Sequence, residues 1–199
     1  MAQIKKTEVR DAILAAAFEL FSAQGYSATA LTAISKAAGV SKANLYVYFD
    51  SKLDILYTLY EPWMRARIAR LEADIAQVPD SRGKLRTLIR ALWRDIPSEE
   101  NGFVNNIMQA LSSALPVDQY RPTLVNWLEE RITALLESML SPSRLKIFHG
   151  ARIAQILIMA LDGYAIHYHL RPKEDDVDDA SIEAMVSLIL GEPGPASRG

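Results

Sequence analysis

Residues 29–56 read TALTAISKAAGVSKANLYVYFDSKLDIL, and this stretch decides the fold of the chain. It has the pattern of a short helix, a tight turn at Gly39 and a second short helix. Glycine adopts the positive φ that such a turn needs, and the small Ala37 and Ala38 allow two helices to cross closely. Ser41 stands where its side chain caps the second helix by accepting a backbone hydrogen bond. These features indicate a helix-turn-helix, a unit whose second helix enters the major groove of DNA.

More residues with the same pattern follow the turn at fixed offsets: Leu45, Tyr46, Tyr48, Phe49, Lys52 and Leu56. The string AGVSKANLYVYFDSK at 38–52 resembles the signature of the tetracycline-repressor (TetR) family of transcriptional regulators. The resemblance covers residues 7–60 and beyond them depends on length and helix pattern alone. Ser35, where the family usually has a small apolar residue, and Leu53, where an acidic residue is common, depart from the pattern. Neither departure removes an expected DNA contact.

The composition is that of a globular chain of one or two domains. Half of its 199 residues are hydrophobic, which is enough for a sizeable core. The absence of cysteine excludes a disulfide framework, a thiolate metal site and a cysteine nucleophile. The chain begins MAQIKKTEVRDAIL, which is no signal peptide, and its most apolar run, 153–161, is too short to span a bilayer. We therefore expect a cytoplasmic protein without a membrane segment.

The charges are unevenly distributed. The whole chain carries a formal charge of −2, whereas residues 1–56 hold six Lys and Arg against five Asp and Glu. The bias is small, but the positive groups lie at the amino terminus and around the helix-turn-helix. Because phosphate contacts need local positive charge rather than a basic chain, the overall charge does not exclude DNA.

Apolar spacing at steps of three and four predicts an all-α fold of about nine helices, with no strand. The helices are expected near 7–24, 31–38, 42–49, 51–77, 84–96, 98–115, 118–140, 143–171 and 179–190. We predict an N-terminal three-helix helix-turn-helix DNA-binding domain at 1–52, a helical regulatory, ligand-binding and dimerisation domain at 53–191, and a disordered tail at 192–199. No flexible linker separates the domains, so their boundary falls within the fourth helix, where Pro62 is expected to cause a kink.

The DNA-contacting residues are expected in and around the second motif helix. Asn44 offers a donor and an acceptor for adenine or a phosphate, and Lys52 together with the amides of the next helix suits a phosphate. The resemblance implies DNA contact by Lys42, Asn44, Tyr46, Tyr48 and Lys52. The complete predicted set is Thr29, Thr32, Ser41, Lys42, Asn44, Tyr46, Tyr48 and Lys52. The alternative is an ordinary surface helix with its aromatic side chains packed inward.

The C-terminal part carries no comparable signature. The resemblance implies an effector cavity there, lined by apolar and aromatic groups, and a small apolar or aromatic ligand. The candidates are Trp63, Trp93, Phe103, Met108, Trp127 and Met159. Ordinary core packing is the competing interpretation for each of them. Asn105, Asn106 and Gln109 either orient a polar end of the ligand or face solvent.

The eighth and ninth predicted helices are apolar on more than one face, which exceeds the need of a single core. This surplus favours a two-fold homodimer, as a pseudo-palindromic operator requires. The expected interface residues are Ile153, Leu157, Ala160, Tyr164, Met185 and Ile189.

No residue pattern indicates catalysis or a bound cofactor. There is no glycine-rich phosphate loop, and His167 and His169 point away from each other on a helix, which is poor spacing for a metal. We therefore predict no enzyme, no metal and no cofactor. The leading hypothesis is a homodimeric repressor that a small ligand releases from its operator. The alternatives are a helical ligand-binding protein or enzyme with an incidental helix-turn-helix, and a constitutive repressor without an inducer.

Overall fold

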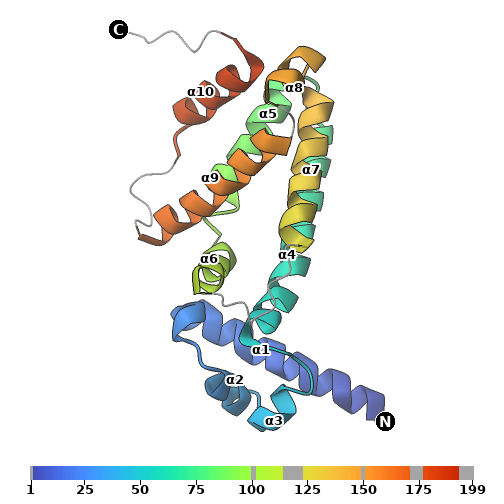
Figure 1. Ribbon diagram of the computed structural model, residues 1–199, viewed down its shortest axis with the longest axis vertical. Coiled ribbons are helices and arrows are strands. Elements are labelled where there is room, and N and C mark those ends of the chain that lie inside the picture. Colours follow the sequence, from blue (N-terminus) through green and yellow to red (C-terminus); the bar gives the residue numbers. More distant parts are fainter. Residues whose placement is uncertain (1, 100–101, 114–122, 149–150, 171–176, 193–199) are drawn as a thin grey trace. The chain divides into compact units, whose positions relative to one another are not determined.

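The computed structural model describes residues 2–99, 102–113, 123–148, 151–170 and 177–192 (Figure 1). Within these ranges the chain forms ten α-helices and one π-helix and no strand, so the all-α prediction is confirmed. None of the helices described is long and apolar enough to cross a bilayer. The chain divides into two compact units. Unit 1 takes in Met1–Met64 and Glu100–Arg121, and unit 2 takes in Arg65–Glu99 and Pro122–Gly199.

Unit 1 carries the predicted helix-turn-helix. Its elements are α1 (Ala2–Ala28), α2 (Leu31–Ala37), α3 (Lys42–Leu45), the first half of α4 (Lys52–Ala76) and α6 (Phe103–Ser113). Helix α1 packs on both α2 and α6. Ile13, Ala17 and Phe21 recur every four residues on α1 and are buried, as one apolar stripe of a helix requires. Gly25 leaves helical geometry with φ 82° and ψ 165°, so α1 is broken where the sequence predicted its end.

Unit 2 is a layered helical assembly. It contains the second half of α4, α5 (Ser81–Arg90), the π-helix η1 (Ala91–Asp95), α7 (Thr123–Met139), α8 (Pro142–Phe148), α9 (Ala151–Leu170) and α10 (Asp179–Leu190). Helix α9 packs against α7 and η1, and α5 packs against α7 and α10. The core side chains include Leu85, Leu88, Leu92, Ile132, Leu136, Leu157 and Val186.

Several helix bounds differ from the sequence prediction for local reasons. Helix α3 ends at Leu45, and turns replace the predicted helix over 46–48. Helix α5 begins three residues early because the Asp80 carboxylate accepts a hydrogen bond from the Gly83 amide (2.8 Å). At Ala91 it widens into η1, where the Ile96 amide donates to the Ala91 carbonyl (2.9 Å).

Other differences concern the longer helices. The predicted helix at 143–171 corresponds to α8 and α9, and α4 runs through Pro62 as one helix. The compact units divide within α4, and α6 belongs to unit 1. The predicted domain division at 52/53 stays a prediction. The ends of the predicted helices near 115 and 118, most of the acidic stretch before Asp178 and the predicted tail after 192 lie outside the described residues.

Candidate functional site

The turn between α2 and α3 has the geometry that the sequence predicted. Gly39 adopts φ 68°, in the left-handed region that favours glycine. The Asn44 amide donates to the Ser41 hydroxyl (3.1 Å), so Ser41 caps α3. Ile34 and Leu45 are fully buried and join the two short helices. A packed core therefore lies below the turn, and α3 is presented at the surface.

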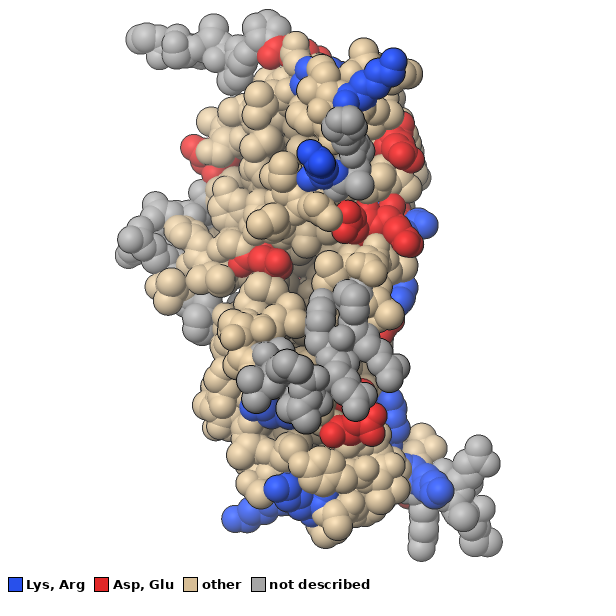
Figure 2. Space-filling model, viewed as in Figure 1, with Lys and Arg blue, Asp and Glu red and all other residues tan. Residues whose placement is uncertain are grey.

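The predicted DNA-contacting residues of α2, of α3 and of the turns next to α3 are mostly accessible. Thr32, Ser41, Lys42 and Tyr46 are exposed, and Asn44 and Tyr48 are half-buried. The Lys42 ammonium lies 5.9 Å from the centre of the Tyr46 ring. Figure 2 shows lysine and arginine side chains on the surface of unit 1 near the end that carries α2 and α3.

Val47 is a candidate contact that the sequence reasoning missed. Its side chain is 70% exposed, although it lies between the buried Leu45 and Phe49 in the chain. An apolar side chain in this place suits the methyl group of a thymine in the major groove. The signal was present in the sequence: if Leu45 and Phe49 face the core, the residue between them faces outward.

Thr29 and Lys52 were predicted to contact DNA phosphates, but in this structure both side chains bind neighbouring protein groups. Thr29 is 1% exposed, and its hydroxyl donates to the Gly25 carbonyl (2.7 Å). The Lys52 ammonium donates to the carbonyls of Tyr26 (2.8 Å) and Thr29 (2.9 Å) and lies 4.0 Å from the centre of the Tyr26 ring. In this structure both side chains hold the segment that follows the break at Gly25.

Helix α6 holds the same segment from the other side. The Asn106 side-chain carbonyl accepts from the Tyr26 amide (2.7 Å), and its NH₂ group donates to the Phe21 carbonyl (3.2 Å). The Gln109 side-chain carbonyl accepts from the Ser27 amide (3.0 Å). The break at Gly25 makes these contacts necessary, because amides after a helix break need new acceptors. Asn106, at 2% exposed, therefore does not face solvent, and both ends of its side-chain amide bind the backbone around Gly25.

The six predicted effector-contacting residues lie in several different environments. In unit 1, Trp63 contacts Phe103 with ring centres 5.3 Å apart, and Met108 is half-buried on α6. In unit 2, Trp93 is 5% exposed, Trp127 is half-buried and Met159 is 70% exposed. The Trp93 ring lies 5.6 Å from Tyr164, and the Arg65 guanidinium lies 4.3 Å from the Trp127 ring centre.

One buried and one half-buried polar group of unit 2 stand out. The Trp93 indole N–H has no hydrogen-bond partner among the residues described. On α9, burial raises the pKa of the Asp162 carboxyl from 3.8 to about 6, because the ionised form loses hydration. The described residues contain no group of three or more His, Asp or Glu side chains that could hold a metal ion.

The predicted dimer residues divide between core and surface. Ile153, Leu157 and Ile189 are buried within the protomer, and Ala160, Tyr164 and Met185 are half-buried. The exposed apolar side chains of the same helices are Ile156, Met159, Ile166, Leu170 and Leu188. In a homodimer formed through these helices, the other protomer would therefore contact the exposed apolar side chains.

A short capped helix presented beside a glycine turn, with a separate helical unit in the same chain, defines a DNA-binding transcriptional regulator of the helix-turn-helix class. Residues 13–57 match the family model of bacterial regulatory proteins of the tetR family. The chain belongs to that family, as the resemblance indicated.

The similarity to known proteins extends along nearly the whole chain. It is 25% identical over 180 residues to the fatty acid metabolism regulator protein of Bacillus subtilis (strain 168), covering 90% of this chain and 93% of that protein. It is 23% identical over 189 residues to the HTH-type transcriptional activator FasR of Mycolicibacterium smegmatis, covering 95% and 84%. The crystal structure of FadR from Bacillus subtilis in complex with stearoyl-CoA matches with a TM-score of 0.65 at 21% identity, covering 92% and 98%. These proteins are named as regulators, not as enzymes.

Proposed function

We propose that this protein is a homodimeric repressor that binds a two-fold operator and releases it when a long-chain acyl-CoA binds to unit 2. The observation that carries the proposal is the exposed, capped α3 in a chain similar along its length to regulators of fatty acid metabolism. A fatty acyl chain fits the apolar ligand expected from the sequence. The stearoyl-CoA complex of one structural neighbour supplies the chemical class.

An apolar stripe on α9 supports the homodimer. Ile156, Met159, Ile166 and Leu170 follow one another at helical spacing and are 54%, 70%, 46% and 72% exposed. The exposed Gly163 lies in the middle of this stripe, where the absence of a side chain permits close approach of a second helix. Leu188 on α10 is 64% exposed, and Figure 2 shows few charged side chains over α9 and α10. Exposed apolar stripes of this kind are typical of protein interfaces.

A buried side chain of unit 2 favours a ligand that carries a polar group. A buried N–H without a partner is rare in a folded protein, and Trp93 carries one. The thioester carbonyl of an acyl-CoA is an acceptor of suitable strength. Apolar binding sites commonly use a few such polar groups to orient the ligand.

The test is a titration of operator binding with and without effector. DNA fragments retained by the protein from genomic DNA supply the operator, and fluorescence anisotropy gives its affinity. Stearoyl-CoA should weaken binding about 100-fold, which requires a coupling of roughly 2.7 kcal/mol between the two sites. Unchanged operator affinity, under conditions where thermal stabilisation shows that stearoyl-CoA is bound, would rule out this mode of regulation.

The direction of regulation needs a separate measurement. Because one relative is named an activator, transcription from the operator fragment should be measured in a purified system. We expect the protein to lower transcription and stearoyl-CoA to restore it. Higher transcription with the protein present would exclude repression and leave the DNA-binding conclusion intact.

A further inference from the structure

A groove on unit 2 is lined by four arginines that the helix-turn-helix does not use. It lies between α4 and the segment formed by α5 and η1, and its volume is about 230 Å³. Its polar lining residues are Arg67, Arg70, Asp74, Arg86, Thr87, Arg90 and Asp95. The volume is below that of a site for a whole drug-sized ligand, so the groove suits one charged part of a larger molecule.

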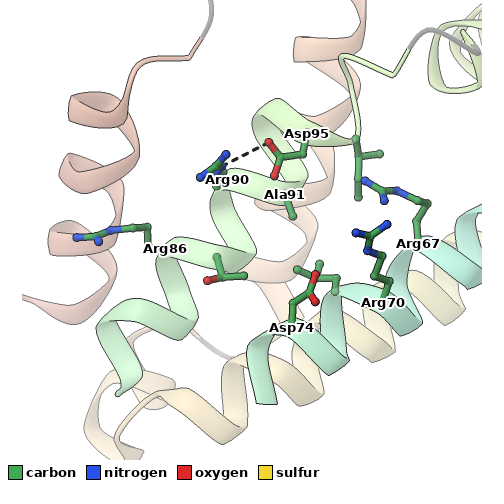
Figure 3. Close-up of a pocket in the computed structure, with 10 residues that line it drawn as sticks. Arg67, Arg70, Asp74, Arg86, Arg90, Ala91 and Asp95 are labelled. Carbon is green, nitrogen blue, oxygen red and sulfur yellow. Dashed lines mark hydrogen bonds and ion pairs between the residues drawn. The ribbon is translucent and has the colours of Figure 1, made fainter. Parts of the chain in front are cut away.

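The arginines differ in how they are paired. Arg67 lies 2.6 Å from Glu99, and Arg86 is paired with Glu183 of α10. Figure 3 shows Arg86 pointing away from the groove. Arg90 makes a long contact of 3.5 Å with Asp95. Arg70 forms no ion pair or hydrogen bond within the described part of the chain.

Figure 3 shows Arg67 and Arg70 side by side on α4, with Arg90 and Asp95 on the facing segment. Two neighbouring guanidinium groups repel each other, and an anion between them and Arg90 relieves the repulsion. Arginine binds phosphate oxygens through paired, charge-assisted hydrogen bonds, which makes phosphate the favoured anion. Asp74, one turn after Arg70 and also exposed, offers an acceptor for a hydroxyl or amino group. Phosphate beside a hydroxyl or amino group is the chemistry of a nucleotide.

The groove also adjoins the apolar interior of unit 2. Its floor is formed by Leu71, Ala91 and Ile96, which are 5%, 9% and 2% exposed. The same π-helix that contributes Ala91 and Asp95 to the groove carries Trp93, which is buried. Helical turns of this wider kind occur often at functional sites. A ligand with its charged end in the groove therefore lies directly over buried apolar side chains of unit 2.

We infer that this groove binds the phosphate-bearing nucleotide part of the CoA thioester, while the acyl chain enters the interior of unit 2. The inference rests on the proposed function, because that proposal supplies the effector. It adds a site and names its residues: Arg70 and Arg90 bind the phosphates, and Arg67 reinforces them from its place beside Arg70.

The test compares four probes on the full-length protein by isothermal titration calorimetry: stearoyl-CoA, free CoA, inorganic pyrophosphate and stearate. Arg70→Gln and Arg90→Gln should each weaken stearoyl-CoA and free CoA about tenfold, since each removes a charge-assisted contact. Stearate affinity should not change, because stearate has no phosphate. Lys146→Gln on α8 is the matched control, since it removes one exposed positive charge outside the groove.

The outcomes separate this inference from the proposed function. If wild-type protein binds stearoyl-CoA and both arginine variants bind it equally well, the groove is not the nucleotide site, and the proposed effector stands. If wild-type protein binds neither CoA compound, both proposals fail. Pyrophosphate binding that depends on Arg70, in protein that does not bind CoA, also overturns the CoA assignment.

Discussion

Two lysines near the helix-turn-helix, ten residues apart, stand in different surroundings. Lys42 is exposed at the start of α3, where its ammonium is free to approach a phosphate. Lys52 donates to two backbone carbonyls and lies over the Tyr26 ring. Sequence alone gives both the same role, because both are lysines at the start of helices close to the turn. Their separate roles lead to different predictions.

Lys42→Gln should weaken binding to the operator and to unrelated DNA by a similar factor, because a phosphate contact carries little sequence information. The slope of log affinity against log salt concentration should fall in magnitude by about one. Anisotropy titrations at several salt concentrations measure both quantities. The melting temperature should stay unchanged, and a wild-type salt slope would show that Lys42 makes no phosphate contact.

Lys52→Met should lower the free energy of unfolding by about 1–3 kcal/mol, since two carbonyls in a partly buried site would lose their charged donor. Urea denaturation followed by circular dichroism measures the loss. Lys36→Met, an exposed lysine on α2, is the control and should leave stability unchanged. Wild-type stability of Lys52→Met together with weaker DNA binding would instead support the phosphate contact predicted from the sequence.

At the scale of elements, the break in α1 is stabilised by a helix about 80 residues further along the chain. The Asn106 and Gln109 side chains of α6 accept hydrogen bonds from the amides that follow Gly25. A residue with a side chain at Gly25 would be strained by φ 82°, and its Cβ would lie 3.0 Å from the Gln109 side chain. Gly25, Asn106 and Gln109 therefore form one structural unit that fixes the end of α1.

Asn106→Ala should destabilise the protein by about 1–3 kcal/mol, because the buried Tyr26 amide loses its side-chain acceptor and the Phe21 carbonyl loses the Asn106 donor. Asn105→Ala is the matched control, since Asn105 is the half-buried neighbour of the same type. Thermal and urea denaturation of both variants gives the comparison. Equal stability of the two would mean that the Asn106 contacts contribute little.

Asp162 on α9 predicts a pH dependence of stability. Its folded pKa of about 6 lies above the ordinary 3.8, so the folded state favours the neutral acid. The free energy of unfolding should fall as pH rises from about 4 to about 6 and then stay level. Asp162→Asn should remove this penalty, worth on the order of 2–3 kcal/mol at most at pH 7. Urea denaturation at pH 4 and pH 7 checks it: a stabilisation that is the same at both pH values would exclude ionisation of Asp162 as the cause.

The elements show how far a sequence predicts a structure. Gly39 and Ser41 act on residues within four positions, so the turn, the cap and the helix-turn-helix followed from local chemistry. The partners of Asn106 lie 80 and 85 residues away, and no periodic pattern marks such a pair. The widening at η1 was also unpredictable, because its residues fit an α-helix equally well. The groove arginines did not stand out in the sequence either, because exposed arginines at helical spacing are typical of any solvated surface.

At the scale of the whole molecule, the proposed function depends on an assembly of two chains. An operator with two half-sites roughly 34–36 Å apart binds tightly only if both helix-turn-helix units are joined. The sequence predicted Leu157 and Ile189 at the interface. Both are fully buried in the protomer, so replacing them tests folding before it tests assembly.

Met159→Glu should give a folded monomer, because it places a charge in the proposed apolar interface while the side chain, at 70% exposed, is not needed for the core. Leu157→Glu is the contrasting variant. Its side chain is 0% exposed, so the charge should unfold or aggregate the protein. Light scattering gives the mass, circular dichroism gives the fold, and anisotropy should show that the Met159→Glu monomer has lost tight operator binding but keeps weak binding to any DNA. A folded Met159→Glu protein that remains dimeric would place the interface elsewhere, and the stripe on α9 would then need another partner.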